Sequence, residues 1–151
     1  MRNLTLRVAS DNDRNFVEEV YFETQRWLIE RLFGWRGDDL EKRKFAQVYD
    51  QANSRIISTD GVDVGWLTVV RNEDAWELEG IYLRVSHQRK GLGTDLIRQL
   101  LDDATLASVP LRLSTAKINP ARYLYARMGF QEVYEDEFKV YMEGKAGQCS
   151  R

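Results

Sequence analysis

The stretch Gln88-Arg89-Lys90-Gly91-Leu92-Gly93-Thr94 joins an apolar run at residues 81–85 to a run whose apolar residues recur at helical spacing over residues 92–101. This order is typical of a strand, a glycine-rich loop and a helix. Two glycines at a helix start let the backbone come close to a ligand. The first N–H groups of a helix lack partners within it and lie at the positive end of its dipole, which suits a pyrophosphate. The stretch predicts an anion-binding loop, to which Arg89 and Lys90 add charge; the alternative is a tight turn without a ligand.

Two well-known phosphate-binding loops differ from this one. A P-loop has four residues between its glycines and continues as Gly-Lys-Ser/Thr, which this chain lacks. The dinucleotide fingerprint needs a third glycine at the position that Leu96 occupies. The pattern that remains over residues 88–93 is Gln-x-x-Gly-x-Gly.

A second motif lies downstream, Asn119-Pro120-Ala121-Arg122-Tyr123-Leu124-Tyr125-Ala126-Arg127-Met128-Gly129-Phe130. With the loop at residues 88–94, it resembles the paired signatures of the GNAT acetyltransferase superfamily, Gln-x-x-Gly-x-Gly and Asn-x-x-Ala/Arg followed by Leu-Tyr-x-x-x-Gly-Phe. The motifs occur in the family's order, joined by a predicted helix and strand. The resemblance covers at least residues 62–142 and is to the small, single-domain bacterial-type members.

The length of 151 residues fits one domain. The apolar periodicity predicts an α/β (α+β) fold in which a mixed, mostly antiparallel sheet of about seven strands has helices on both faces. The resemblance implies the GNAT-like acyl-CoA N-acyltransferase fold, with the sheet splayed between its fourth and fifth strands. We expect a single domain over residues 1–144 and a disordered tail over residues 145–151. The expected strands are 4–8, 55–58, 62–70, 75–85, 111–114, 130–134 and 138–143, and the expected helices are 16–32, 38–49, 92–107 and 120–128.

Composition excludes several classes of function. A formal net charge of −2 gives nucleic-acid binding no global electrostatic support. Cys149 and His87 are the only residues of their types, which leaves no disulfide framework and no usual zinc site, so we expect no metal. No apolar stretch approaches the roughly 20 residues of a membrane span, and the N-terminus lacks the apolar core of a signal peptide. We therefore expect a cytoplasmic protein that binds neither nucleic acid nor membrane.

The resemblance implies acetyl-CoA as cosubstrate and assigns residues to it. Its pantetheine arm would add to the exposed strand edge at Ile81, Tyr82 and Leu83. Asn119 matches a position that bonds this arm, and a helix cap is an equal alternative. The diphosphate would lie on the glycine loop, whose implied contacts are Gln88, Arg89, Lys90, Gly91, Leu92, Gly93 and Thr94.

The resemblance also implies the catalytic residues. Tyr125 matches the family's tyrosine, and a phenol of pKa about 10 is a competent donor to a leaving thiolate whose thiol has a pKa of about 8.5. Its alternative role is core packing. Glu77 and Glu79 lie two residues apart on one face of the expected strand, near the position of the family's general base. The alternative, two solvated carboxylates, stays open, and so does the choice between the two.

The expected reaction is the transfer of an acetyl group to a primary amine by direct attack on the thioester. The acceptor, a small molecule or a peptide, stays open, as does the choice between a monomer and a homodimer. A non-catalytic acyl-CoA-binding or sensing domain on the same fold is the alternative. The aromatic residues of the first two helices are expected either in the core or lining an acceptor pocket; they are Trp27, Phe33, Trp35 and Phe45.

Overall fold

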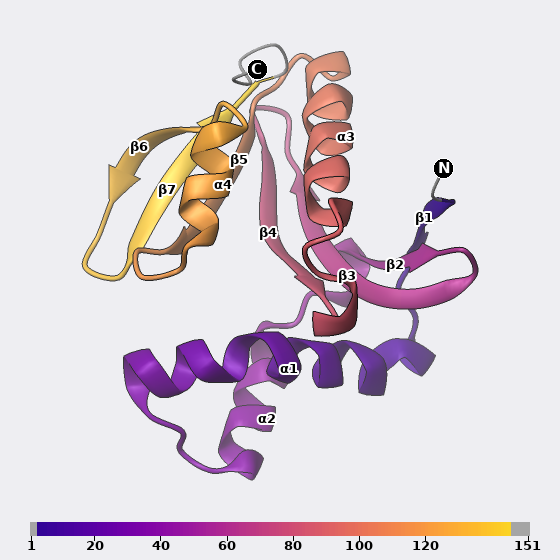
Figure 1. Ribbon diagram of the computed structural model, residues 1–151, viewed down its shortest axis with the longest axis vertical. Helices are drawn as coiled ribbons and strands as arrows, with labels where there is room; N and C mark the ends of the chain where they lie inside the picture. Colours follow the sequence, from indigo (N-terminus) through magenta and orange to yellow (C-terminus); the bar gives the residue numbers. More distant parts are fainter. Residues whose placement is uncertain (1–2, 146–151) are drawn as a thin grey trace. The chain divides into compact units, whose positions relative to one another are not determined.

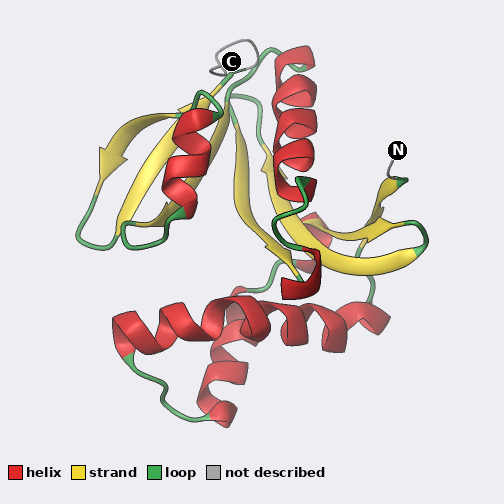
Figure 2. Ribbon diagram, in the orientation of Figure 1, coloured by secondary structure: helices red, strands yellow, loops and turns green. Residues whose placement is uncertain are grey.

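The computed structural model describes residues 3–145 (Figure 1). Its seven strands follow the order β1-β2-β3-β4-β5-β7-β6 in one sheet, and four α-helices accompany them within these residues (Figure 2). The chain divides into two compact units. The first contains the residues up to Thr68 and the segment Ile81–Lys90, and the second contains Val69–Gly80 and the residues from Gly91 onward. Apart from Lys145, the predicted tail lies outside the described residues.

The first unit contains an antiparallel arrangement of β1 (Leu4–Val8), β2 (Ser54–Thr59) and the first part of β3 (Val62–Arg71). The turn between β2 and β3 consists of Asp60 and Gly61, whose φ angles are 52° and 81°. Positive φ at both central residues defines the two-residue turn that matches the twist of a hairpin. The Asp-Gly pair therefore marks this hairpin correctly.

Helices α1 (Arg14–Phe33) and α2 (Asp38–Val48) complete the first unit, with short 3-10 turns at Asp11–Asp13, Gln51–Asn53 and Val85–His87. Gly34 is the C-cap residue of α1, and its φ of 77° suits a glycine. A buried cluster packs these helices on the strands, and the indole N–H of Trp66 in β3 donates to the carbonyl of Val17 in α1 at 3.0 Å. Its buried members are Ala9, Val17, Val20, Phe45, Ile56 and Trp66.

The second unit is built around β5 (Leu111–Ala116), which pairs with β7 (Lys139–Gly144), and β7 with β6 (Gln131–Glu135), both antiparallel. Helices α3 (Leu92–Leu106) and α4 (Ala121–Arg127) belong to this unit. The inner face of α3 supplies a fully apolar stripe at helical spacing, as the sequence predicts. Its buried residues are Leu92, Leu96, Ile97, Leu100, Leu101 and Ala104.

The parallel pair in the sheet is β4 (Trp76–Leu83) with β5. Its register covers Trp76–Leu78 against Leu111–Leu113, whereas β5 continues along β7 to Ala116. β4 and β5 therefore pair over a short stretch near their N-terminal ends, which is the expected splay between the fourth and fifth strands. The predicted fold class is confirmed. Within residues 3–145, no helix combines the length and the apolar character that crossing a bilayer requires.

Candidate active site

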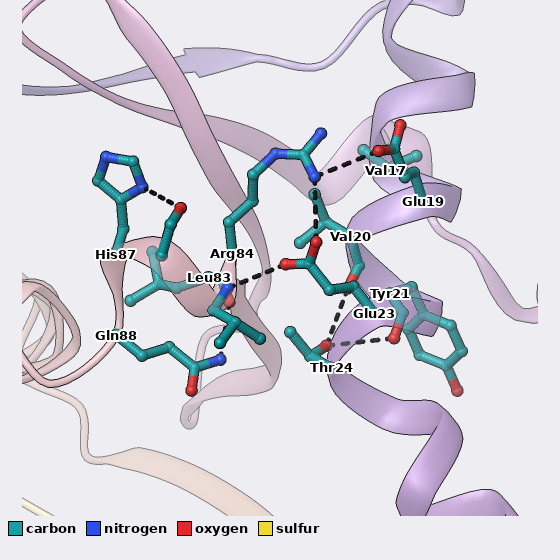
Figure 3. Close-up of polar contacts among 12 residues, drawn as sticks. Val17, Glu19, Val20, Tyr21, Glu23, Thr24, Leu83, Arg84, His87 and Gln88 are labelled. Carbon is teal, nitrogen blue, oxygen red and sulfur yellow. Dashed lines mark hydrogen bonds and ion pairs between the residues drawn. The ribbon is translucent and has the colours of Figure 1, made fainter.

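The end of β4 is held to the segment that follows it. The side-chain amide of Gln88 donates to the carbonyl of Leu83 at 2.9 Å, so its N–H group folds back onto the strand end (Figure 3). The backbone N–H of Arg84 donates to the carbonyl of Val64 in β3 at 2.8 Å. These two bonds fix the backbone between the predicted pantetheine edge at residues 81–83 and the glycine loop.

Two carboxylates of α1 hold the same segment. The guanidinium of Arg84 lies 3.3 Å from Glu19 and 3.3 Å from Glu23, which are neighbours on one helix face (Figure 3). Glu23 also accepts a hydrogen bond from the backbone N–H of Val85 at 2.9 Å. Sequence analysis missed Glu19 and Glu23, because nothing local links α1 to a segment about sixty residues away.

Gly65 in β3 is a second residue that sequence analysis missed. A Cβ atom at this position would collide with the carbonyl oxygen of Tyr82 and would come within 3.0 Å of the Cα of Leu83. Only glycine lets β3 and the last residues of β4 lie this close. Gly65 thereby positions the strand segment that the resemblance assigns to the pantetheine arm.

Two residues of the glycine loop have positive φ angles. Arg89 has a φ of 61° and Gly91 a φ of 82°, and α3 begins directly afterwards at Leu92. The N–H of Asp95 makes the first intrahelical bond, to the carbonyl of Gly91 at 3.0 Å. The N–H groups before it in the first turn have no intrahelical acceptor. Arg89 and Lys90 are exposed and form no ion pair with residues 3–145, so both cations are available to an anion.

Glu77 and Glu79 line one cavity of the second unit, with a volume of about 330 Å³. They share a face of the sheet, as the two-residue spacing predicts. Leu78 of the same strand also lines the cavity, and neighbouring strands supply the other walls, which are Arg112, Leu113, Ser114, Val133, Tyr141 and Met142.

An arginine connects two carboxylates at this cavity. Arg112 is aligned with Glu77 on β4 and with Glu143 on β7. Its Nη1 lies 3.9 Å from Glu77 Oε1, and its Nε lies 3.0 Å from Glu143 Oε2. Burial raises the pKa of the half-buried Glu77 carboxyl above its usual value; Arg112 opposes this, and Glu79 and Glu143 add to it. Sequence analysis missed Arg112, although the alternation Leu-Arg-Leu-Ser at residues 111–114 places it on the face opposite the leucines.

Tyr125 lies on α4 with its ring packed edge-on against Phe130, at 5.9 Å between centroids. Burial raises its pKa, so the hydroxyl keeps its proton at neutral pH. The hydroxyl makes no hydrogen bond to another described residue. Tyr123, two residues earlier, is 62% exposed, which agrees with its prediction as a surface or packing residue on another helix face.

Asn119 lies just before α4, whose N-cap residue is Pro120 rather than the Asn119 that the sequence predicts. Its Oδ1 accepts a hydrogen bond from the backbone N–H of Ala121 at 3.0 Å. The helix itself starts at Ala121, one residue later than the sequence predicts. The side-chain N–H₂ donates to no residue among those described, so the bond to Ala121 leaves it available for a cofactor contact.

The helices of the first unit form a cavity of their own, of about 240 Å³. Phe33 and Phe45, two of the four aromatic residues considered for an acceptor pocket, line it. The other two do not: Trp35 packs on Phe22 and Trp27 is 45% exposed. Among residues 3–145, no group of three or more histidine, cysteine, aspartate or glutamate side chains is arranged to hold a metal ion.

Comparison with known proteins identifies the family. Residues 16–130 match the family described as the acetyltransferase (GNAT) family. No curated protein sequence matches the chain.

Solved structures share the fold at low identity. The PaiA N-acetyltransferase from Thermoplasma acidophilum, in complex with coenzyme A, has a TM-score of 0.75 at 17% identity, over 95% of this chain and 99% of that one. The ribosomal-protein alanine N-acetyltransferase from Escherichia coli has a TM-score of 0.66 at 19% identity, over 93% and 92%. N-acetylglutamate synthase from Neisseria gonorrhoeae, complexed with coenzyme A and N-acetyl-glutamate, has a TM-score of 0.62 at 17% identity, over 93% of this chain and 35% of that one. The family match spans most of the chain and agrees with this fold, so the protein belongs to the GNAT acetyltransferase family.

Proposed function

We propose that the protein is an N-acetyltransferase that moves the acetyl group of acetyl-CoA to a primary amine. The observation that carries this proposal is the glycine loop. Its positive φ angles at Arg89 and Gly91 lead straight into the first N–H groups of α3, which lack intrahelical acceptors, and two exposed cations lie beside them in the chain. This donor set fits a diphosphate, which needs several N–H donors and positive charge at one place.

The other contacts to acetyl-CoA follow from the resemblance. We assign the pantetheine arm to the backbone of residues 81–83 and to the side-chain N–H₂ of Asn119. Bonds to Gln88 and Arg84 hold the end of this strand segment in place, which reduces the ordering cost of binding.

The chemistry needs one proton acceptor and one proton donor. An amine of pKa near 10 is mostly protonated at neutral pH and must lose a proton before it attacks. Glu77, with its raised pKa, is our proposed acceptor of that proton. The amine nitrogen then forms a bond to the acetyl carbon, the carbon–sulfur bond breaks, and the Tyr125 hydroxyl gives its proton to the departing sulfur. The nitrogen releases its second proton to solvent as it becomes an amide, and Tyr125 regains a proton from solvent. Backbone N–H groups would stabilise the oxyanion.

The acceptor class is wider than one substrate. The name of one structural neighbour mentions the alanine of a ribosomal protein, and the description of another mentions N-acetyl-glutamate, a small molecule. For this chain, we propose an acceptor with a primary amine, and the carboxylates at the 330 Å³ cavity favour one that carries positive charge.

Acetyl-CoA is expected to raise the melting temperature of the protein, because a ligand that binds only the folded state stabilises it. At 100 times its dissociation constant, the gain is about 2.7 kcal/mol. Thermal melts with and without acetyl-CoA measure this gain, and thiol release over an amine library measures the transfer. No thermal shift at millimolar acetyl-CoA would contradict the proposal. A shift without thiol release for any amine would favour the acyl-CoA-sensing alternative.

Gly93→Asp is expected to weaken acetyl-CoA binding by at least about tenfold, because it places a negative charge where the diphosphate would lie. Gly93 lies in the first turn of α3 without a positive φ, so its replacement tests the ligand rather than the backbone. Gly91→Asp adds backbone strain at a φ of 82° and is the less selective variant. Gln99→Glu adds the same charge to an exposed position later in α3 and is the control. Calorimetry gives both affinities, and equal affinity for wild type and Gly93→Asp would make the loop a simple turn.

A further inference from the structure

The three charged residues that the register aligns across β4, β5 and β7 are not equivalent. Arg112 lies closer to Glu143, at 3.0 Å, than to Glu77, at 3.9 Å. The side chains of Glu77 and Glu143 are 37% and 29% exposed, so both carboxylates are partly withdrawn from water. The guanidinium of Arg112 therefore interacts with two half-buried carboxylates. Its closer contact is with Glu143, which has no part in the proposed chemistry.

No other described residue that lines the cavity offers a positive charge to Glu77 or Glu143. Glu79 on β4 is exposed and brings a further negative charge. Tyr141 on β7 donates its hydroxyl hydrogen bond to Asp136 at 2.8 Å, which engages its proton elsewhere. From β6, the cavity receives the apolar Val133. Arg112 is thus the positive charge among the residues that line it.

We propose that Arg112 is a positioning residue that divides its ion pairing between Glu77 and Glu143, and so keeps the Glu77 carboxylate oriented and free to accept the proton of the acceptor amine. This inference rests on the proposed function. A guanidinium can serve two carboxylates at once because its planar fork carries five N–H donors. The pair with Glu143 holds the fork, and the longer contact with Glu77 orients that carboxylate without fully occupying it.

Two substitutions should act on Glu77 in opposite directions. Arg112→Gln removes the positive charge and leaves the neighbouring carboxylates, so the titration midpoint of Glu77 should rise. Glu143→Gln removes a negative charge and frees Arg112 to pair with Glu77, so the midpoint should fall. Shifts of opposite sign would show that both neighbours are electrostatically coupled to Glu77, and the rate measurement below tests the positioning role itself.

Carbon-13 NMR of the glutamate carboxyl groups tests this without an acceptor. Comparison with Glu77→Gln assigns the Glu77 signal, and a pH titration gives its midpoint in wild type, Arg112→Gln, Glu143→Gln and Arg112→Lys. Arg112→Lys keeps the charge and should stay close to wild type. Arg122→Gln breaks another arginine–glutamate pair of the same unit, with Glu132 at 2.7 Å, and should leave the midpoint unchanged. Midpoints that do not move, or that move in the same direction, would overturn the proposal.

The rate with the most active amine of the thiol-release screen gives the second readout. In Arg112→Gln, the acidic limb of the kcat/KM profile should move to higher pH, with a loss of about fivefold on that limb, the size that an exposed ion pair supports. In Glu143→Gln, the limb should move to lower pH. If the NMR midpoints move but the acidic limb of the kcat/KM profile does not, the positioning role of Arg112 is refuted and the proposed function is not. Turnover that is unaffected by Glu77→Gln would instead refute Glu77 as the base of the proposed function.

Discussion

Tyr125→Phe is expected to lower turnover with a true amine acceptor by roughly a hundredfold, while acetyl-CoA affinity stays nearly unchanged. Phenylalanine keeps the ring that packs on Phe130, so the fold and the melting temperature should be preserved. Without the hydroxyl, the thiolate must leave unprotonated or take a proton from water. A hundredfold loss corresponds to about 2.7 kcal/mol at 1.36 kcal/mol per tenfold, within the range of general acid catalysis.

The loss should appear in kcat rather than in cofactor affinity, because the bond forms only as charge develops on sulfur. Since burial raises the pKa of Tyr125, the hydroxyl stays protonated through the neutral range, and its deprotonation should limit the rate only above the usual range of a phenol. Tyr123→Phe is the matched control on the same helix and should be nearly silent. Full turnover in Tyr125→Phe, with chemistry shown to be rate-limiting, would make Tyr125 a structural residue.

Glu77→Gln should also lose roughly a hundredfold in turnover at neutral pH, the scale of a lost general base. The glutamine keeps the size of the side chain but cannot accept the proton of the amine. The pKa of Glu77 is raised in wild type. As the pH is lowered, the carboxylate should therefore become protonated, and the rate should begin to fall, at a higher pH than for an ordinary glutamate. In the variant, the deficit should shrink at high pH, where the amine is neutral without help.

Glu79→Gln separates the two candidate bases. Glu79 lines the same cavity but is exposed, and no ion pair holds it among the described residues. We therefore expect a much smaller loss for this variant, measured as kcat over a pH series with the same amine. A larger loss in Glu79→Gln than in Glu77→Gln would identify Glu79 as the general base. No loss in either variant would indicate that solvent accepts the proton.

Local patterns predicted most of the fold. The Asp60-Gly61 turn, the apolar stripe of α3 and the glycine loop all depend on residues close in sequence, and the structure has each where its pattern places it. The strand that follows α3 and the helix after it could be predicted for the same reason. Their boundaries differ from the expected ones by one or two residues, as for α4, which starts at Ala121.

Contacts between distant segments were not predictable. Gly65 matters because β3 lies against Tyr82, which only the strand pairing reveals. Arg112 matters because the register aligns it with Glu77 on one side and Glu143 on the other. A single sequence determines which face of a strand a residue occupies, but not which residue of the neighbouring strand lies opposite it.

The division of the chain into two units has a consequence for how the protein can be cut. The boundaries fall at Thr68 and Val69 inside β3, at Gly80 and Ile81 inside β4, and at Lys90 and Gly91 in the glycine loop. A fragment that ends at Thr68 would lack the ring of Tyr82, which packs 4.5 Å from that of Trp66. Neither unit is therefore a continuous piece of chain, and no single truncation yields one whole. Proteolytic nicking, or expression of the chain as two separate halves, should give fragments that fold only when they are recombined.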